Sequence, residues 1–191
     1  MDNPKYKNIV DHYQNCYQKF GDNHLGVDWP NEEDLKKRYQ VALGLIKKED
    51  KNPTLLDFGC GTAGLYQFSL NAKNGVDIKY SGLDLGELYI NRCLEKYPNN
   101  DFYHVDILKE NNIPQFDYII MNGVFTEKRD LSFEEMLIYF KQMIIAIYSR
   151  ADKGIAFNVM SKAVDWERED LFHLGTDVLI DFLTKEVSRN F

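Results

Sequence analysis

The chain has 191 residues, a length that suits one globular domain with a sizeable core. Hydrophobic residues make up 44% and charged residues 28%, which excludes an intrinsically disordered chain. The formal net charge of −7 argues against nucleic acid as a partner, because phosphate binding needs a basic surface. The three cysteines, Cys16, Cys60 and Cys93, are scattered, so we expect reduced thiols and a cytoplasmic location.

No segment of the sequence suggests a membrane partner. Residues 1–5 lack the apolar core that a signal peptide needs. The longest apolar stretch near the C-terminal half, Met143–Tyr148, is too short to cross a bilayer. We therefore expect a soluble protein.

Residues 1–50 are expected to form an N-terminal helical lid. Ile9, Tyr13 and Phe20 recur at helical spacing and predict a first amphipathic helix. Asn31 is followed by three acids and predicts the start of a second helix, because Asn caps free N–H groups and acids favour the first turn.

Residues 51–191 are expected to form the core of the same single domain. Apolar strands alternate here with helical segments. Strands are predicted at 54–58, 80–83, 102–105, 116–121 and 154–160, and helices at 65–71, 86–97, 132–150 and 176–188. This alternation implies a parallel sheet with right-handed crossovers. The expected fold class is α/β, a Rossmann-like three-layer αβα sandwich with a mostly parallel central sheet.

A glycine-rich turn follows the first predicted strand. Gly59, Gly61 and Gly64 have the spacing G-x-G-x-x-G between a strand and a helix. Such glycines let the backbone turn tightly and approach a nucleotide-type ligand closely. We count Cys60 and Thr62 in this turn as cofactor-binding residues too. The spacing alone does not identify a site, because glycine turns also serve structural roles.

Two acids at strand ends strengthen the prediction of a nucleotide-type ligand site. Asp84 closes the second strand, twenty positions after Gly64, where a carboxylate can accept both hydroxyls of a ribose. Asp106 closes the third strand, where it could take the exocyclic amine of an adenine. Each could instead cap the helix that follows. Both lie at carboxyl ends of strands, the edge where open α/β sheets bind ligands.

The charge beside the glycine turn favours a cationic ligand. A dinucleotide would place its pyrophosphate there, and Asp57 just before the turn is a poor neighbour for phosphate. S-adenosylmethionine carries a sulfonium and an ammonium cation, which an acidic lip formed by Asp57 would attract. We therefore count Asp57 among the cofactor-binding residues.

Residues 54–160 resemble a class I S-adenosylmethionine-dependent methyltransferase. The resemblance rests on four segments in the family's order: Leu55–Leu65 for its first motif, Ser81–Leu85 for its ribose-binding acid, His104–Ile107 for its adenine-binding acid, and Phe116–Gly123 for its fourth motif. It implies S-adenosyl-L-methionine as cofactor and S-adenosyl-L-homocysteine as product.

The resemblance also assigns roles to single residues. Gly59 and Gly61 would lie along the methionine part of the cofactor. Leu85 and Ile107 would flank the adenine, and Asn122 and Gly123 would lie near the reacting methyl. Members with an N-terminal lid often use an aromatic residue and an Arg on the methionine carboxylate, for which Trp29 and Arg38 are the candidates here.

One feature departs from the family. Its sheet normally has seven strands, the last two forming a hairpin, whereas five are predicted here before the sequence reaches Arg189, where a sixth would begin. The fold would then lack its C-terminal β-hairpin, and the fifth strand would have an open edge. We expect a homodimer that covers this edge, or a chain of marginal stability.

The methyl acceptor cannot be identified from the sequence. Transfer from a sulfonium needs mainly alignment, and a general base only where the acceptor must lose a proton. His12, His24 and His173 are the candidate bases, and each could equally be structural. Asn122 lacks the following prolines of DNA amino methyltransferases, so a small-molecule O or N acceptor is preferred. The loop 161–167 is expected to border the acceptor pocket. No metal site is expected, because the sequence lacks a His and Cys cluster with the spacing typical of zinc sites.

Two other classes stay open. A non-catalytic or truncated Rossmann-like module would keep the cofactor site without an acceptor pocket. An NAD-dependent oxidoreductase shares the glycine turn, although it would need more chain for a substrate domain and would not favour Asp57.

Overall fold

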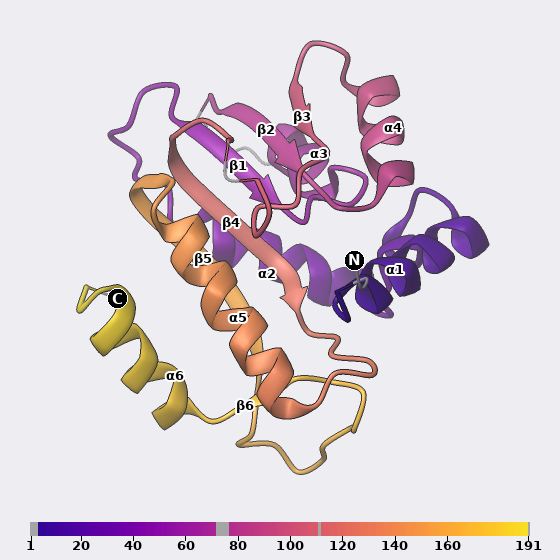
Figure 1. Ribbon diagram of the computed structural model, residues 1–191. Coiled ribbons are helices and arrows are strands. Elements are labelled where there is room, and N and C mark those ends of the chain that lie inside the picture. Colours follow the sequence, from indigo (N-terminus) through magenta and orange to yellow (C-terminus); the bar gives the residue numbers. More distant parts are fainter. Residues whose placement is uncertain (1–3, 72–76, 111, 191) are drawn as a thin grey trace.

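The computed structural model describes residues 4–71, 77–110 and 112–190 and contains a six-stranded sheet (Figure 1). The strand order is β3-β2-β1-β4-β5-β6, and every neighbouring pair is parallel. The strands are β1 (Thr54–Phe58), β2 (Lys79–Leu83), β3 (Asp101–Tyr103), β4 (Phe116–Phe125), β5 (Ala151–Ser161) and β6 (His173–Leu174). The predicted parallel α/β sheet is confirmed.

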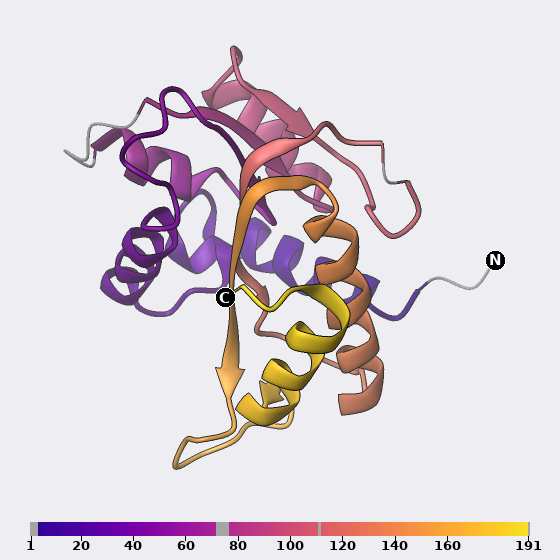
Figure 2. The same ribbon diagram turned by 90° about the vertical axis from the view of Figure 1, so that its left-hand side faces the viewer.

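Helices cover both faces of the sheet and form the two outer layers. They are α2 (Glu32–Leu43), α3 (Gly64–Asn71), α4 (Glu87–Lys96), α5 (Phe133–Tyr148) and α6 (Thr176–Phe182), which continues as a π-helical turn (Leu183–Val187). Residues of α2, α3 and α4 pack in one apolar cluster, and residues of α5 and α6 pack in the other. Figure 2 shows α6 lying beside α5. The predicted three-layer αβα sandwich is confirmed.

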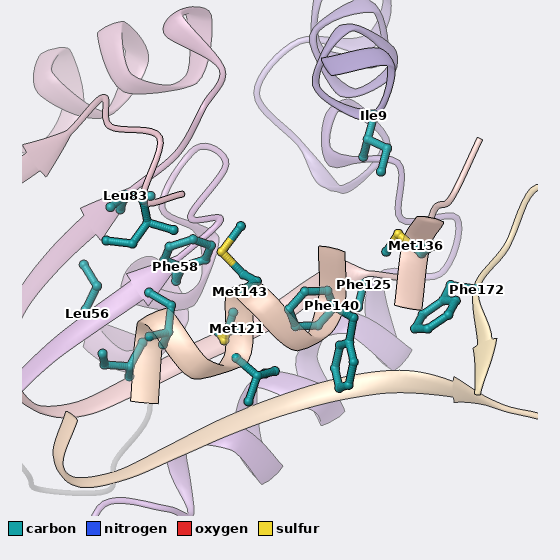
Figure 3. Packing of buried hydrophobic residues seen from close by; sticks show 14 of the residues in the cluster. Ile9, Leu56, Phe58, Leu83, Met121, Phe125, Met136, Phe140, Met143 and Phe172 are labelled. Carbon is teal, nitrogen blue, oxygen red and sulfur yellow. The ribbon is translucent and has the colours of Figure 1, made fainter. Parts of the chain in front are cut away.

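The central strand β4 has a deeply buried middle section. Tyr118, Ile119, Ile120 and Met121 are each no more than 1% exposed, as expected for a parallel strand covered on both faces. Helix α5 packs against it through one apolar stripe, and the ring of Phe140 meets that of Phe125 edge to face at 4.8 Å (Figure 3). This core fixes the position of the loop that follows β4.

The sixth strand was missed, and the predicted place for it was wrong. It lies before the last helix, where His173 and Leu174 pair with Met160 and Ser161. Two residues are too few to give an alternating pattern that a sequence can show. Within the described residues no strand follows α6, so the C-terminal hairpin is absent from that part of the chain. Phe191 lies outside the described residues.

The N-terminal segment lies across the carboxyl ends of the strands (Figure 1). It contains α1 (Lys7–Phe20), a short 3-10 helix η1 (His24–Val27) and α2. The predicted cap is confirmed, since the Asn31 side chain accepts a hydrogen bond from the backbone N–H of Asp34. Tyr89 of α4 connects the core to this segment, because its hydroxyl lies 2.6 and 2.7 Å from the carbonyl oxygens of Tyr13 and Gly26.

Across the described ranges, no helix is long and apolar enough to span a membrane.

Candidate functional site

A cavity of about 710 Å³ lies between the N-terminal helices and the carboxyl ends of β1, β2 and β4. This volume is in the range of small-molecule sites. From the core, the wall is made by Phe58, Gly59, Cys60, Gly61, Thr62, Leu83, Asp84, Leu85, Tyr89, Asn122, Gly123, Val124 and Tyr139. From the N-terminal segment and α3 come Ile9, Val10, Tyr13, Asp22, Asn23, His24, Val27, Trp29, Glu32, Leu35, Lys36, Tyr39, Gly64, Gln67, Phe68 and Asn71.

The glycine turn forms the floor of this cavity. Gly59 and Gly61 have φ of +74° and +51°, the left-handed region in which glycine is least strained. The backbone N–H groups of Gly59 and Cys60 both donate to the carbonyl of Leu83, which ties the turn to the end of β2. A Cβ on Gly61 would lie 2.7 Å from Cγ1 of Val27. The turn therefore brings bare backbone against both the cavity and the N-terminal segment.

Asp84 lies on the wall at the end of β2. Its Oδ2 accepts a hydrogen bond from the N–H of Gly61 at 2.9 Å, and its Oδ1 accepts one from the N–H of Gly86 at 2.7 Å. Burial raises the pKa of the carboxyl above its ordinary value, and these two amides oppose the rise. Each carboxylate oxygen can accept a second bond, so both can still receive a donor from a ligand.

Asp57 does not form the predicted acidic lip. It is 3% exposed, and its Oδ2 accepts the Tyr80 hydroxyl at 2.7 Å. Burial raises its pKa to about 7, the Tyr80 hydrogen bond opposes this, and nearby Asp84 adds to it. Among the described residues, the cavity lining includes Asp84 and not Asp57. The reason is strand geometry: Asp57 lies within β1, whereas Asp84 follows the last residue of β2.

The expected adenine end is only partly open to the cavity. Leu85 lies on the wall, whereas Asp106 and Ile107 are absent from the described lining. Ile107 is buried in the apolar cluster around α5. Asp106 accepts the Tyr6 hydroxyl at 2.6 Å, and the ring of Tyr6 stacks on that of Tyr139 at 5.0 Å. Tyr6, just before α1, thus bonds the carboxylate that the sequence assigned to adenine.

Asn122 and Gly123 lie where the fourth motif was expected, at the opposite wall. Gly123 has φ of +83°, and a Cβ there would lie 3.2 Å from the Trp29 ring. Its N–H donates to Oδ1 of Asn158 in β5 at 2.8 Å. Trp29 therefore packs directly on the backbone at the end of β4.

The two N-terminal candidates, Trp29 and Arg38, line different cavities. Trp29 lines the cavity, whereas Arg38 lies beside a second, mainly apolar cavity of about 290 Å³ between α2 and the β4–β5 face. The guanidinium of Arg38 lies over the Trp29 ring at 5.2 Å, and its Nε donates to Asp34 at 3.0 Å. Arg38 therefore packs on the Trp29 ring and is absent from the described lining of the first cavity.

The three histidines differ sharply in their surroundings. His24 lines the cavity, and its Nδ1 donates to the carbonyl of Trp29 at 2.6 Å, which leaves Nε2 as the unprotonated nitrogen of the neutral ring. His173 is 3% exposed, with Nδ1 donating to the Ser161 carbonyl and Nε2 accepting from the Arg168 N–H. His12 pairs with Asp28 and is absent from the described lining. Of the three, His24 is the one that lines the described cavity, so it remains the candidate base.

Several lining residues were not predicted. Ile9 and Tyr13 line the cavity from α1, and their i, i+4 spacing could have shown that one face of this helix is turned inward. Tyr139 on α5 gives no such signal, because only the path of the chain brings it to the cavity wall. The loop 161–167 was expected at the acceptor pocket and does not line either described cavity.

Comparisons with known proteins identify the fold. No protein-family model matches the sequence, and no curated protein matches it. Among solved structures, magnesium protoporphyrin IX methyltransferase from Synechocystis PCC 6803, with bound S-adenosylhomocysteine, has a TM-score of 0.63 at 15% identity and covers 95% of this chain and 85% of its own. The N-methyltransferase NodS from Bradyrhizobium japonicum WM9, also with S-adenosylhomocysteine, has a TM-score of 0.59 at 16% identity over the same shares.

The fold is that of class I S-adenosylmethionine-dependent methyltransferases. A third similar structure is the [4+2]-cyclase SpnF, with a TM-score of 0.56 at 19% identity over 82% of this chain and 60% of its own. One architecture therefore accompanies more than one reaction, and the reaction has to be argued from the site.

Proposed function

We propose that the protein is an S-adenosylmethionine-dependent methyltransferase with a small-molecule O or N acceptor. The observation that carries this proposal is Asp84 on the wall of a cavity floored by the Gly59–Thr62 turn. The other acids of the wall are paired, Asp22 with Arg92 and Lys96, and Glu32 with Lys36. Asp84 is held by backbone amides instead, so its negative charge suits a cationic nucleoside better than a pyrophosphate.

The cofactor would lie along the carboxyl ends of β1, β2 and β4. Gly59, Cys60, Gly61 and Thr62 would contact its methionine part, and Asp84 would accept its ribose hydroxyls. Leu85 would flank the adenine. Asp106 keeps acceptor positions beside its bond to Tyr6, but it lies outside the described lining, so Tyr6 would have to shift for the adenine amine to reach it. Asn122, Gly123 and Trp29 would enclose the methyl group from the β4 side.

The reaction requires the chain mainly to position its substrates. The cofactor supplies an activated methyl group on sulfur, and the walls hold the acceptor in line with it, which can account for several kcal/mol of the barrier. For an acceptor that must lose a proton, Nε2 of His24 is the base that this cavity offers. His24 donates a hydrogen bond to the backbone carbonyl of Trp29, so one segment would position both the cofactor and the base.

Calorimetric titration with S-adenosylhomocysteine and, separately, with NAD distinguishes the enzyme classes. We expect one site for S-adenosylhomocysteine and none for NAD. Binding of NAD alone would replace this proposal with an oxidoreductase. A screen of labelled methyl transfer to small O and N acceptors then separates an enzyme from a cofactor-binding module without catalysis.

We further propose that a second copy of the chain covers the open edge of β5. In the described structure β6 pairs with Met160 and Ser161 only, which leaves the outer edge of Ala151–Val159 unpaired. Light scattering during size-exclusion chromatography should give the mass of a dimer, and a stable monomer across concentrations would exclude it. A cytoplasmic location stays a prediction from the three free cysteines.

A further inference from the structure

Three metal-ligating side chains meet within the N-terminal segment, outside the described lining of the first cavity. His12 and Cys16 are one helical turn apart on α1, and Asp28 follows η1 twelve residues later. One ligand atom from each lies within 4.8 Å of the other two. His12 Nε2 is 2.7 Å from Asp28 Oδ2 and 3.8 Å from Cys16 Sγ. An imidazole, a thiol and a carboxylate therefore converge on one point.

We propose that His12, Cys16 and Asp28 bind a zinc ion that ties α1 to the segment carrying Trp29. Zinc takes this mixture of nitrogen, sulfur and oxygen ligands in tetrahedral geometry, with bonds of about 2.0–2.3 Å. Ligand atoms around such an ion lie roughly 3.3–3.8 Å apart, so the His12–Cys16 pair already has a suitable separation. The His12–Asp28 pair has to open by less than about 1 Å.

The protonation changes at this site balance simply. In the described structure Nε2 of His12 donates to the Asp28 carboxylate. On zinc binding that proton moves to Nδ1, the Cys16 thiol loses its proton to water, and no oxidation occurs.

The surroundings allow three protein ligands and a water. The side chains of His12 and Asp28 are 21% and 36% exposed, so an ion can reach them and keep one water ligand. The nearby cation Arg129 is held by Glu127 at 3.2 Å and by Asp170 at 3.6 Å. Its charge is thus compensated before a metal arrives, and Glu127 stays with Arg129 in place of becoming a fourth ligand.

Such a site would fix the N-terminal segment in the position that it has over the cavity. Asp28 directly precedes Trp29, and Tyr13 lies on α1 between the two other ligands and lines the cavity. Fixing His12 and Cys16 to Asp28 would therefore fix two walls of the cavity relative to each other. This role does not depend on which reaction the cavity catalyses.

Cobalt(II) is a suitable probe because a thiolate ligand gives it a charge-transfer band in the near ultraviolet. The full chain, kept reduced with a phosphine, is titrated with cobalt(II) chloride. We expect a thiolate-to-cobalt band that saturates at one equivalent and disappears when zinc is added. Cys16→Ser should abolish the band, and His12→Gln should weaken cobalt binding at least about tenfold.

The controls separate this site from adventitious binding. Asp11→Asn removes an exposed acid from the same helix and should leave the titration unchanged, whereas Asp28→Asn should weaken it. Circular dichroism of each variant verifies that the chain is folded. Absence of the band from the wild-type chain would overturn the proposal, and so would an unchanged band in folded Cys16→Ser, which would assign the thiolate to Cys60 or Cys93.

Discussion

The carboxylate of Asp84 accepts a hydrogen bond from the backbone N–H of Gly61, with 2.9 Å between Oδ2 and the nitrogen. The bond joins the end of β2 to a turn that lies 23 residues earlier in the chain. It holds the glycine turn at the depth where its backbone meets the cavity. The acid that is expected to bind the ribose therefore also shapes the surface expected to receive the methionine part.

Replacing Asp84 should weaken cofactor binding strongly. Asp84→Ala removes a carboxylate that can accept two ribose hydroxyls, each worth about 1.5–3 kcal/mol as a bond to a charged group. We expect affinity for S-adenosylhomocysteine to fall at least about tenfold, measured by calorimetry. Asp101→Asn, an exposed acid that begins β3, serves as the control and should change nothing. Unchanged affinity in folded Asp84→Ala would remove this residue from the site.

Gly61 combines a left-handed backbone with a close contact to the N-terminal segment. Gly61→Ala places a side chain at φ of +51°, which destabilises by about 1–2 kcal/mol. The new Cβ would also lie 2.7 Å from Cγ1 of Val27, closer than two carbon atoms can pack. The free energy of unfolding in urea should therefore fall by a further ~1 kcal/mol or more beyond the cost of backbone strain.

The double variant Gly61→Ala/Val27→Ala tests the cause of that further destabilisation. Truncating Val27 removes the Cγ1 atom that lies 2.7 Å from the new Cβ. Part of the extra destabilisation should then be recovered as a favourable coupling energy. Purely additive effects of the two substitutions would show that Val27 is not the obstacle.

The sequence predicted the layers of this fold better than the details of its site. Alternating strands and helices, the glycine turn and the ends of β1 and β2 follow from local patterns, and the structure confirms them. Strand β6 could not be predicted, because its two residues pair only through contacts with distant Met160 and Ser161. Burial of Asp57 was missed for a related reason: whether a strand-end acid faces a ligand or the interior depends on which residue ends the strand.

The contact of Asp106 with Tyr6 shows the same limitation. Position after a strand predicts that Asp106 reaches the ligand edge of the sheet, whereas the structure leaves it outside the described cavity lining. The sequence gives no indication that a tyrosine 100 residues earlier supplies its hydrogen-bond partner. Likewise the His12 and Cys16 spacing is visible along α1, whereas the approach of Asp28 depends on the turn at η1.

Trp29 should matter more for cofactor binding than Arg38. Trp29 packs on Gly123 and lines the cavity, whereas the Arg38 side chain bonds Asp34 and lies over the outer face of the indole. Calorimetry should show that Trp29→Ala lowers the affinity for S-adenosylhomocysteine at least about tenfold, because the substitution removes a large aromatic ring from the cavity wall. Arg38→Ala should change it by less than about threefold. The opposite order would mean that Arg38 turns into the cavity when the ligand binds.

Asp57 should make the folded chain less stable as the pH rises from about 4 to about 7. Its pKa is about 7 in the folded chain against an ordinary value of 3.8, because burial disfavours the charged carboxylate. The folded state therefore holds this proton more tightly than the unfolded state does. The resulting stabilisation is complete below about pH 4 and is lost as the pH rises to about 7. Between pH 5 and pH 8 the loss amounts to about 3 kcal/mol of unfolding free energy.

Asp57→Asn isolates this contribution, because the amide keeps an oxygen for the Tyr80 hydroxyl and cannot ionise. Other carboxylates titrate in both chains, so the difference between wild type and variant reports Asp57. Urea unfolding at pH 5 and pH 8 should show the variant gaining about 3 kcal/mol relative to the wild type at the higher pH. A difference that does not change with pH would mean that Asp57 is already ionised in the folded chain. It would then sit close enough to a cation or to water to serve as the acidic neighbour that its place before the glycine turn predicts.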